Sequence, residues 1–298
     1  MDTILTCDNG IAAIDEIAWA KAQKMTVLVT DHHAVPFEEH EGRRTEKKSL
    51  ADAVVNPHQQ DCGYPYKELC GAGVAWNVIR VLYENYDMDK REAEDLLDFV
   101  AMATVCDVMS LTGENRILVK EGLKRIRHTK NIGLQALMQA CNVQPENISA
   151  YHFGYVLGPC VNATGRLDTA RHALRLFETG QETEAEEIAR DLVDLNQERK
   201  ELTLQGVEMA KKLCEEGGYE NDPILVLFLP DVHESIAGLI AGRIREMYNR
   251  PVFVLTRGEE GVKGSGRSTE NYSMYENMCG CVEPVSYTHL TLPTNSLV

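Results

Sequence analysis

The sequence predicts an α/β protein in which a domain built on a parallel sheet is joined by a long helix to a second, smaller α/β domain. Residues 25–30 form an apolar, β-branched run, which is typical of a strand buried on both faces of a parallel sheet. Residues 11–23 keep an apolar helical face and connect this run to a shorter one at residues 3–6, as in a βαβ unit. Residues 182–216 keep a helical spacing of apolar positions, and no glycine or proline interrupts them before Gly206.

The elements between these landmarks follow the same alternation. Residues 53–57 predict a third short strand that ends at a proline. Gly71 and Gly73 open a helix, where glycine permits close packing against the sheet. Further helices are expected at residues 96–108, 118–126 and 133–138, and the second domain is expected to hold a strand at 224–228, a helix at 236–248 and a strand at 251–255.

The composition is that of a globular protein without secretory or membrane features. The 298 residues are 44% apolar and 26% charged, and the longest apolar run, near residues 224–229, is too short to span a bilayer. The nine cysteines are scattered without zinc-type pairs, so we expect reduced thiols in the cytoplasm. The net charge of −16 argues against non-specific coating of nucleic acid or membrane. It still permits a nucleic-acid enzyme, because carboxylates that hold divalent cations invert the local field.

Residues with metal-ligand chemistry stand where the first two strands end. Asp8 follows the first strand, and Asp31, His32 and His33 follow the second. The carboxyl ends of adjacent parallel strands meet at one edge of the sheet, so Asp8 and His32 are expected to be neighbours that share a metal. The alternative is that Asp8 and Asp31 only cap turns.

Asp107 lies in an almost uncharged, apolar helix, where a carboxylate must be paired, protonated or bound to a metal. A turn carboxylate hydrogen-bonded to the backbone is the alternative for this residue.

Two further segments favour ligand binding. Residues 157–168 are predicted as a loop of small residues that presents Asn162 and Arg166, unless Arg166 merely pairs with Asp168. Residues 261–268 are predicted as a glycine-rich basic loop, which is a weak signal for an anion cradle when taken alone.

These motifs, in this order, resemble the DHH phosphoesterase superfamily, and most closely its RecJ branch of single-strand-specific exonucleases. Asp-Asn-Gly at 8–10, Asp-His-His at 31–33 and Cys-Asp-Val at 106–108 resemble successive motifs of the family. Residues 158–166 look like the signature that closes its first domain. His233-Glu234, together with residues 265–268, is similar to the DHH-associated C-terminal domain. The resemblance covers Asp2 to about Ser268.

The resemblance implies a domain plan with parts missing. We expect a DHH domain at 1–181, a connecting helix at 182–216, a truncated DHH-associated domain at 217–284 and a non-native tail at 285–298. The first family motif, a strand with alternating aspartates, would lie upstream of residue 1. The chain is therefore expected to be a fragment with weak Mn²⁺ binding and little or no nuclease activity of its own.

The implied activity is a 5′-to-3′ exonuclease that hydrolyses single-stranded DNA with two Mn²⁺ or Mg²⁺ ions, in DNA repair and recombination. In this interpretation Asp8 bridges the metals, while His32 and Asp107 ligate one of them. Asp31 orients His32, and His33 contacts the scissile phosphate or orients it. The substrate-binding residues are expected to be Asn162 and Arg166 for the backbone, with His233, Ser265 and Arg267 at the second domain, the last two holding a 5′ phosphate.

Two other functions stay open. One is an oligoribonuclease or nucleotide phosphatase of the same superfamily, and the other is a non-catalytic nucleic-acid-binding relative. The long helix favours the exonuclease, because small-substrate members join their lobes by a short linker. The implied partners are single-stranded nucleic acid and a single-strand-binding protein or helicase. Asp8, His32 and Asp107 are expected to converge at the ends of parallel strands, within roughly 5 Å of a common point.

Overall fold

The structure is a computed structural model that describes residues 2–40, 43–167, 169–219, 222–258, 261–274 and 277. Asp168 and the expected tail at 285–298 lie outside these residues. The chain divides into two compact units, Met1–Gly158 and Pro159–Val298, and each is described by itself. The domain limits expected from the sequence, with a boundary at 181/182, stay a prediction.

The first unit opens with the predicted βαβ arrangement. Strand β1 (Thr3–Cys7), helix α1 (Ile14–Ala22) and strand β2 (Thr26–Thr30) are followed by β5 (Ala53–Val55) in a parallel sheet of order β1-β2-β5. Cys7 lies opposite Thr30 and Thr30 opposite Val55, so the three strands end together. The core beneath them consists of Ile17, Ala20, Val27 and Val29.

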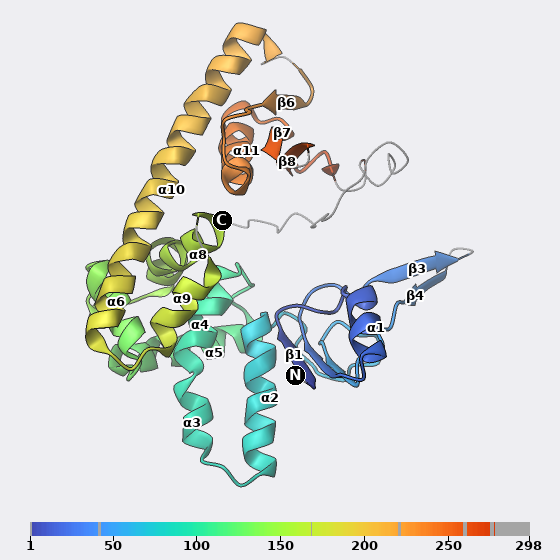
Figure 1. The fold of residues 1–298 in the computed structure, drawn as a ribbon, viewed down its shortest axis with the longest axis vertical. Helices are drawn as coiled ribbons and strands as arrows, with labels where there is room; N and C mark the ends of the chain where they lie inside the picture. The colour runs from blue at the N-terminus through green and yellow to red at the C-terminus, as the bar shows by residue number, and fades with distance from the viewer. Residues whose placement is uncertain are drawn as a thin grey trace. The chain divides into compact units, whose positions relative to one another are not determined.

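An antiparallel ribbon is inserted between β2 and β5. Its strands are β3 (Phe37–His40) and β4 (Arg43–Glu46), which pair with each other alone among the described strands. Figure 1 shows this ribbon extending beyond α1 and β1.

Helices make up the rest of the first unit. They are α2 (Gly71–Asn85), α3 (Lys90–Asp95), α4 (Leu97–Cys106), α5 (Gly113–Arg125), α6 (Ile132–Ala140) and α7 (Ala150–His152), with short 3₁₀ turns η1 (Ile126–His128) and η2 (Pro145–Asn147) and a π-helix η3 (Phe153–Leu157). Helix α4 is buried along most of its length, as expected for residues 96–108, and Asp107 is its C-cap residue.

The second unit contains a long helix and a small mixed sheet. Its elements are α8 (Gly158–Leu167), α9 (Ala170–Glu178), α10 (Glu182–Gly217), β6 (Leu225–Phe228), α11 (Glu234–Tyr248), β7 (Val252–Gly258) and β8 (Gly261–Arg267). The sheet order is β6-β7-β8, with β6 and β7 parallel and β8 antiparallel to β7. The long helix predicted over residues 182–216 is confirmed as α10, the extended helix of Figure 1.

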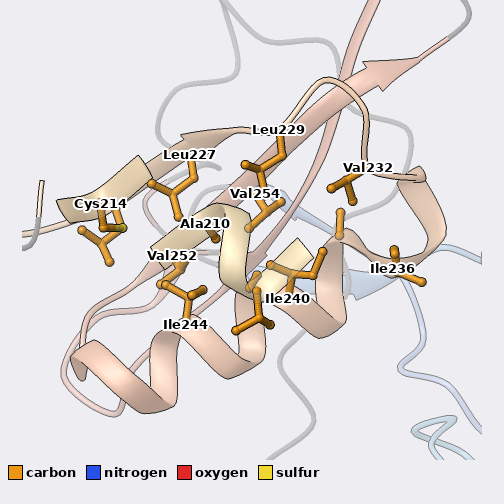
Figure 2. Packing of buried hydrophobic residues seen from close by; sticks show 14 residues of the cluster. Ala210, Cys214, Leu227, Leu229, Val232, Ile236, Ile240, Ile244, Val252 and Val254 are labelled. Atoms are coloured by element: carbon orange, nitrogen blue, oxygen red, sulfur yellow. The ribbon is translucent and has the colours of Figure 1, made fainter. Parts of the chain in front are cut away.

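Helices α10 and α11 bury apolar side chains against this sheet. Ile236, Ile240 and Ile244 recur every four residues on one face of α11 and are fully or almost fully buried. Figure 2 shows them with Val252 and Val254 of β7 in one cluster, to which Ala210 and Cys214 of α10 also belong.

Both segments predicted as glycine-rich loops are regular structure instead. Residues 158–167 form helix α8, and residues 261–267 form strand β8. In each case glycine serves close packing. A Cβ on Gly158 would lie 2.4 Å from Sγ of Cys106, and one on Gly264 would lie 2.5 Å from a methyl carbon of Leu255. The glycines of these two segments suggested loops, but Gly158 and Gly264 instead allow close contacts within a helix and a strand.

Candidate metal centre

The ends of β1 and β2 place the first two candidate ligands. The N–H of Asp8 donates to the carbonyl of Thr30 at 3.0 Å, and the N–H of Asp31 donates to the carbonyl of Val55 at 3.0 Å. The sheet pairing thus continues into the residues that carry the chemistry. Asp8 has a φ of 60°, a left-handed conformation that aspartate tolerates better than most residues.

Asp8, His32 and Asp107 converge as expected. Nε2 of His32 lies 3.0 Å from Oδ1 of Asp8 and 3.3 Å from Oδ2 of Asp107. His33 also belongs to this cluster, because ligand atoms of Asp8, His32 and His33 all lie within 4.8 Å of one another. The expectation that all three residues follow parallel strands is wrong for Asp107, which comes from the C-terminal end of helix α4.

The central atoms of this cluster meet at ion-pair distance without a hydrogen bond of good geometry. Among the described residues, Nε2 of His32 and Oδ2 of Asp107 are buried polar atoms that no donor or acceptor satisfies. Buried polar atoms are almost always paired in folded proteins, so two orphans facing each other need a third group. A divalent cation would satisfy both. The carboxylate of Asp8, whose side chain is 54% exposed, completes an oxygen–nitrogen donor set beside them.

The site's electrostatics carry an excess of negative charge. Burial raises the pKa of Asp107, and the nearby charge of Asp8 raises it further, while His32 acts in the opposite direction. Burial alone would lower the pKa of His32, but the carboxylates of Asp8 and Asp107 outweigh it and raise that pKa. The two carboxylates therefore share one imidazole, that of His32, as a partner.

Cys7 and Cys106 are adjacent in the sequence to Asp8 and Asp107, and Cys70 precedes Gly71, but the described residues whose ligand atoms gather within 4.8 Å include no cysteine. Burial raises the pKa of Cys7, of Cys70 and, to about 11, of Cys106. The ligand atoms that gather at the site are carboxylate oxygens and imidazole nitrogens. That donor set suits Mn²⁺ or Mg²⁺.

Asp31 supports His33 and does not hold the His32 ring, which corrects the expected pairing. Its Oδ1 accepts from the N–H groups of His32 (2.7 Å) and His33 (3.1 Å) and lies 2.7 Å from Nδ1 of His33. Its Oδ2 accepts from the N–H of Ile11 at 2.8 Å. The turn-capping interpretation is therefore correct for Asp31, while for Oδ2 of Asp107 the backbone-bonded alternative does not hold.

Two residues that help to build the site were not recognised from the sequence as part of it. Asn56 is buried and donates from Nδ2 to the carbonyl of His33 at 2.9 Å, so it fixes the segment after β2. An asparagine before proline at a strand end was the available signal. Gly71 was expected to pack closely against the sheet, and its actual neighbour is Asp8. A Cβ on Gly71 would lie 2.4 Å from Cβ and Oδ1 of Asp8.

The substrate-binding candidates fall in the second unit. Asn162 lies on α8 and, with Ser235, lines a cavity of about 660 Å³. His233 is the N-cap residue of α11, where Nδ1 accepts from the N–H of Ser235. Ser265 and Arg267 lie on β8. Arg166 falls within α8, but its side chain lies outside the described residues, as does the alternative pairing with Asp168.

Within the described part of the chain, no helix combines the length and the apolar character needed to cross a membrane.

Several known proteins are similar to this chain over most of its length. A model of the DHH family, N-terminal domain, matches residues 2–104. The single-stranded-DNA-specific exonuclease RecJ of Haemophilus influenzae is 36% identical over 284 residues, which cover 91% of this chain and 48% of that protein. RecJ of Bacillus subtilis is 32% identical over 280 residues, 93% of this chain and 34% of the relative. The chain spans about half the length, or less, of the curated relatives it matches.

Solved structures give the same result for the fold. A crystal structure of RecJ from Thermus thermophilus in complex with Mn²⁺ aligns with a TM-score of 0.78 at 32% identity and covers 94% of this chain and 40% of that one. A crystal structure of an exonuclease RecJ bound to manganese aligns with a TM-score of 0.76 at 32% identity, over 93% of this chain and 66% of that one.

Proposed function

This chain belongs to the DHH family, and from that premise we propose that it is part of a metal-dependent exonuclease that hydrolyses single-stranded DNA from its 5′ end. The observation that carries the proposal is the pair of orphaned buried atoms, Nε2 of His32 and Oδ2 of Asp107, beside the carboxylate of Asp8. The chain spans only about half the length of its relatives, so the activity and the substrate are part of this proposal.

The metal ligands in this proposal are Asp8, His32 and Asp107. A divalent cation supplies positive charge beside the phosphodiester and acidifies water for its hydrolysis. Asp8, whose carboxylate is more exposed than that of Asp107, would be the residue that bridges two ions. His32 and Asp107 would hold one ion through their buried atoms Nε2 and Oδ2, which would then have a partner.

His33 takes the role of a phosphate contact, and Asp31 positions it. The His33 side chain is 58% exposed, whereas that of Asp31 is 2% exposed. Since Nδ1 of His33 lies 2.7 Å from the Asp31 carboxylate, the ring is fixed through that nitrogen. Nε2 is then left to face substrate, and in the protonated ring it donates to a phosphate oxygen.

The second unit supplies the substrate contacts in this proposal. Asn162 and Arg166 on α8 meet the DNA backbone, and Ser265 and Arg267 hold the 5′ phosphate, with His233 nearby on the same unit. A guanidinium can bind two oxygens of one phosphate, which suits an end-recognising enzyme. A single-strand-binding protein or a helicase as partner, a cytoplasmic location and the domain limits 1–181, 182–216 and 217–284 belong to the same proposal.

The metal site is tested by titrating Mn²⁺ into the chain and measuring the free ion by electron paramagnetic resonance. Asp107→Ala should lower the Mn²⁺ affinity by about 100-fold. Loss of a residue that only supports a metal ligand lowers affinity by about 10- to 100-fold, and loss of a ligand should reach at least the upper value. Asp95→Ala, which removes an exposed carboxylate of α3, is the matched control and should leave the affinity unchanged. Equal affinities of the wild type and the Asp107 variant would remove the metal-site interpretation.

The reaction is tested in a protein that extends the chain to the length of its relatives. Digestion of 5′-phosphorylated single-stranded DNA, of duplex DNA and of a dinucleotide should show release of mononucleotides from the single strand. Preference for the dinucleotide would favour the oligoribonuclease or phosphatase alternative. Binding of Mn²⁺ without turnover of any substrate would favour the non-catalytic one.

A further inference from the structure

Gly238 lies on the face of helix α11 that meets strand β8. On β8, Lys263, Ser265 and Arg267 occupy every second position, so their side chains emerge on the same face of the strand. Directly opposite them in β7 are Thr256, Val254 and Val252, which are completely buried in the core that α11 covers. The polar side chains of β8 therefore form the edge of the sheet face that α11 covers. Lys263 confirms this placement with an ion pair to Glu234 in the first turn of α11, at 2.9 Å.

The guanidinium of Arg267 lies directly on Gly238. A Cβ built on Gly238 would lie 2.6 Å from Nη2 of Arg267, 3.3 Å from its Cζ and 2.9 Å from Oγ of Ser265. The other arm of the guanidinium is held in place, because Nη1 donates to Oγ of Ser265 at 3.0 Å and to the carbonyl of Gly266 at 2.8 Å. Any side chain at position 238 would occupy the space that this arrangement uses.

Glycine inside a helix lowers its stability relative to alanine, so its presence in α11 calls for a reason. The same helix provides a comparison one turn later. A Cβ on Gly242 would meet no atom within 4 Å, so glycine there makes no close contact of this kind.

We propose that Gly238 is a positioning residue for phosphate binding, because its missing side chain lets the guanidinium of Arg267 and the hydroxyl of Ser265 rest together on helix α11. This inference rests on the proposed function, in which Ser265 and Arg267 hold a phosphate, and assigns to that site a residue which touches no substrate. Alanine at position 238 pushes the flexible end of Arg267 away from Ser265, and this displacement leaves the apolar core untouched.

The test compares Gly238→Ala with Gly242→Ala in the full chain. The first readout is the Nε–H resonance of Arg267, assigned by its loss in Arg267→Lys. It should move in Gly238→Ala and stay in place in Gly242→Ala. The second readout is the affinity for a 5′-phosphorylated single-stranded oligonucleotide relative to its 5′-hydroxyl counterpart, measured without metal. Gly238→Ala should lose about tenfold of this preference, which is the cost of one charge-assisted hydrogen bond.

The thermal midpoint separates this role from a structural one. Both variants should melt at or above the wild-type temperature, because alanine favours the helix at both positions. An unmoved Arg267 resonance, or an unchanged phosphate preference in Gly238→Ala, would overturn the inference and leave the role of Arg267 intact. If the wild type and Arg267→Lys bind both oligonucleotides equally, the proposed 5′-phosphate site itself fails, and the inference fails with it.

Discussion

Each unit of this protein contains a charged side chain that rests on a helical glycine, and the two cases differ in what they can tolerate. In the first unit, Gly71 at the start of α2 lies against Asp8, and the nearest atoms include Cβ of Asp8, next to its backbone. In the second, Gly238 lies against the far end of Arg267. A flexible tip can swing away at little cost, but a Cβ can move only with its backbone.

The two regions also differ in how far the protein satisfies its own polar groups. Arg267 donates to Ser265 and to the carbonyl of Gly266, while His32 and Asp107 keep buried atoms without a partner. The guanidinium of Arg267 is a cation that the protein itself supplies and holds. The site at Asp8 instead gathers metal-ligand atoms for a cation that the chain does not supply.

Asp31, which lies next to the metal centre, differs from His32 and Asp107 because its carboxylate already has hydrogen-bond partners. Asp31→Ala tests how much these hydrogen bonds stabilise the protein. The buried carboxylate accepts from the N–H groups of Ile11, His32 and His33, so its removal leaves buried donors without acceptors. We expect a loss of about 3 kcal/mol in the free energy of unfolding, measured by urea denaturation. Asp31→Asn keeps one acceptor oxygen and should lose less. Equal losses in the two variants would contradict this account.

The pH dependence of the same residue has a definite sign. Burial raises the pKa of Asp31, but the N–H donors and His33 outweigh it and hold that pKa below its ordinary value. The contribution to stability is therefore present above the unfolded pKa of about 4 and is lost as the pH falls through the folded pKa. Wild type and Asp31→Ala should converge in stability in acid.

The second test is Gly71→Ala, the counterpart of the substitution at Gly238. Because the new Cβ would meet Cβ of Asp8, the whole residue must shift, and with it a proposed metal ligand. We expect the Mn²⁺ affinity to fall about tenfold, within the range seen when the support of a ligand is disturbed. The thermal midpoint should also fall, unlike that of Gly238→Ala.

Gly73→Ala is the matched control in the same helix, since its Cβ would meet Leu69 at an ordinary 3.4 Å. It should bind Mn²⁺ like the wild type. An unchanged midpoint and Mn²⁺ affinity in Gly71→Ala would show that the two glycine contacts are alike after all.

The parts that the sequence predicted well are those fixed by local patterns. The apolar run before Asp31 and the helix before it give the βαβ unit, and parallel pairing then brings Asp8 to His32. Residues 261–267 were misassigned although they pair with strand β7, which directly precedes them in the chain, because their glycines hid the strand pattern. Residues 158–167 were misassigned because Gly158 serves a close contact with the distant Cys106, which the local sequence does not specify. The pairing of Asp31 with His33 depends on side-chain rotamers, which no sequence pattern specifies.

Asp98→Asn tests whether burial of a carboxylate is enough to mark the metal site, and we expect the weakest effect from it. Asp98 is another buried carboxylate of the first unit. Unlike Asp107, it is satisfied by the protein, because Oδ2 accepts from the hydroxyl of Thr129 at 2.7 Å and Oδ1 accepts from the N–H of Phe99 at 2.7 Å. Burial raises the pKa of Asp98, and these two donors offset it only in part. The folded state therefore holds the proton more tightly than the unfolded state, so stability falls as the pH rises from about 4 through the folded pKa. Asp98→Asn should remove this dependence, with a smaller change in urea stability at neutral pH than Asp31→Ala, and should leave the Mn²⁺ affinity within about twofold of the wild type. A large loss of Mn²⁺ affinity in Asp98→Asn would mean that orphaned atoms do not distinguish the metal centre from other buried carboxylates.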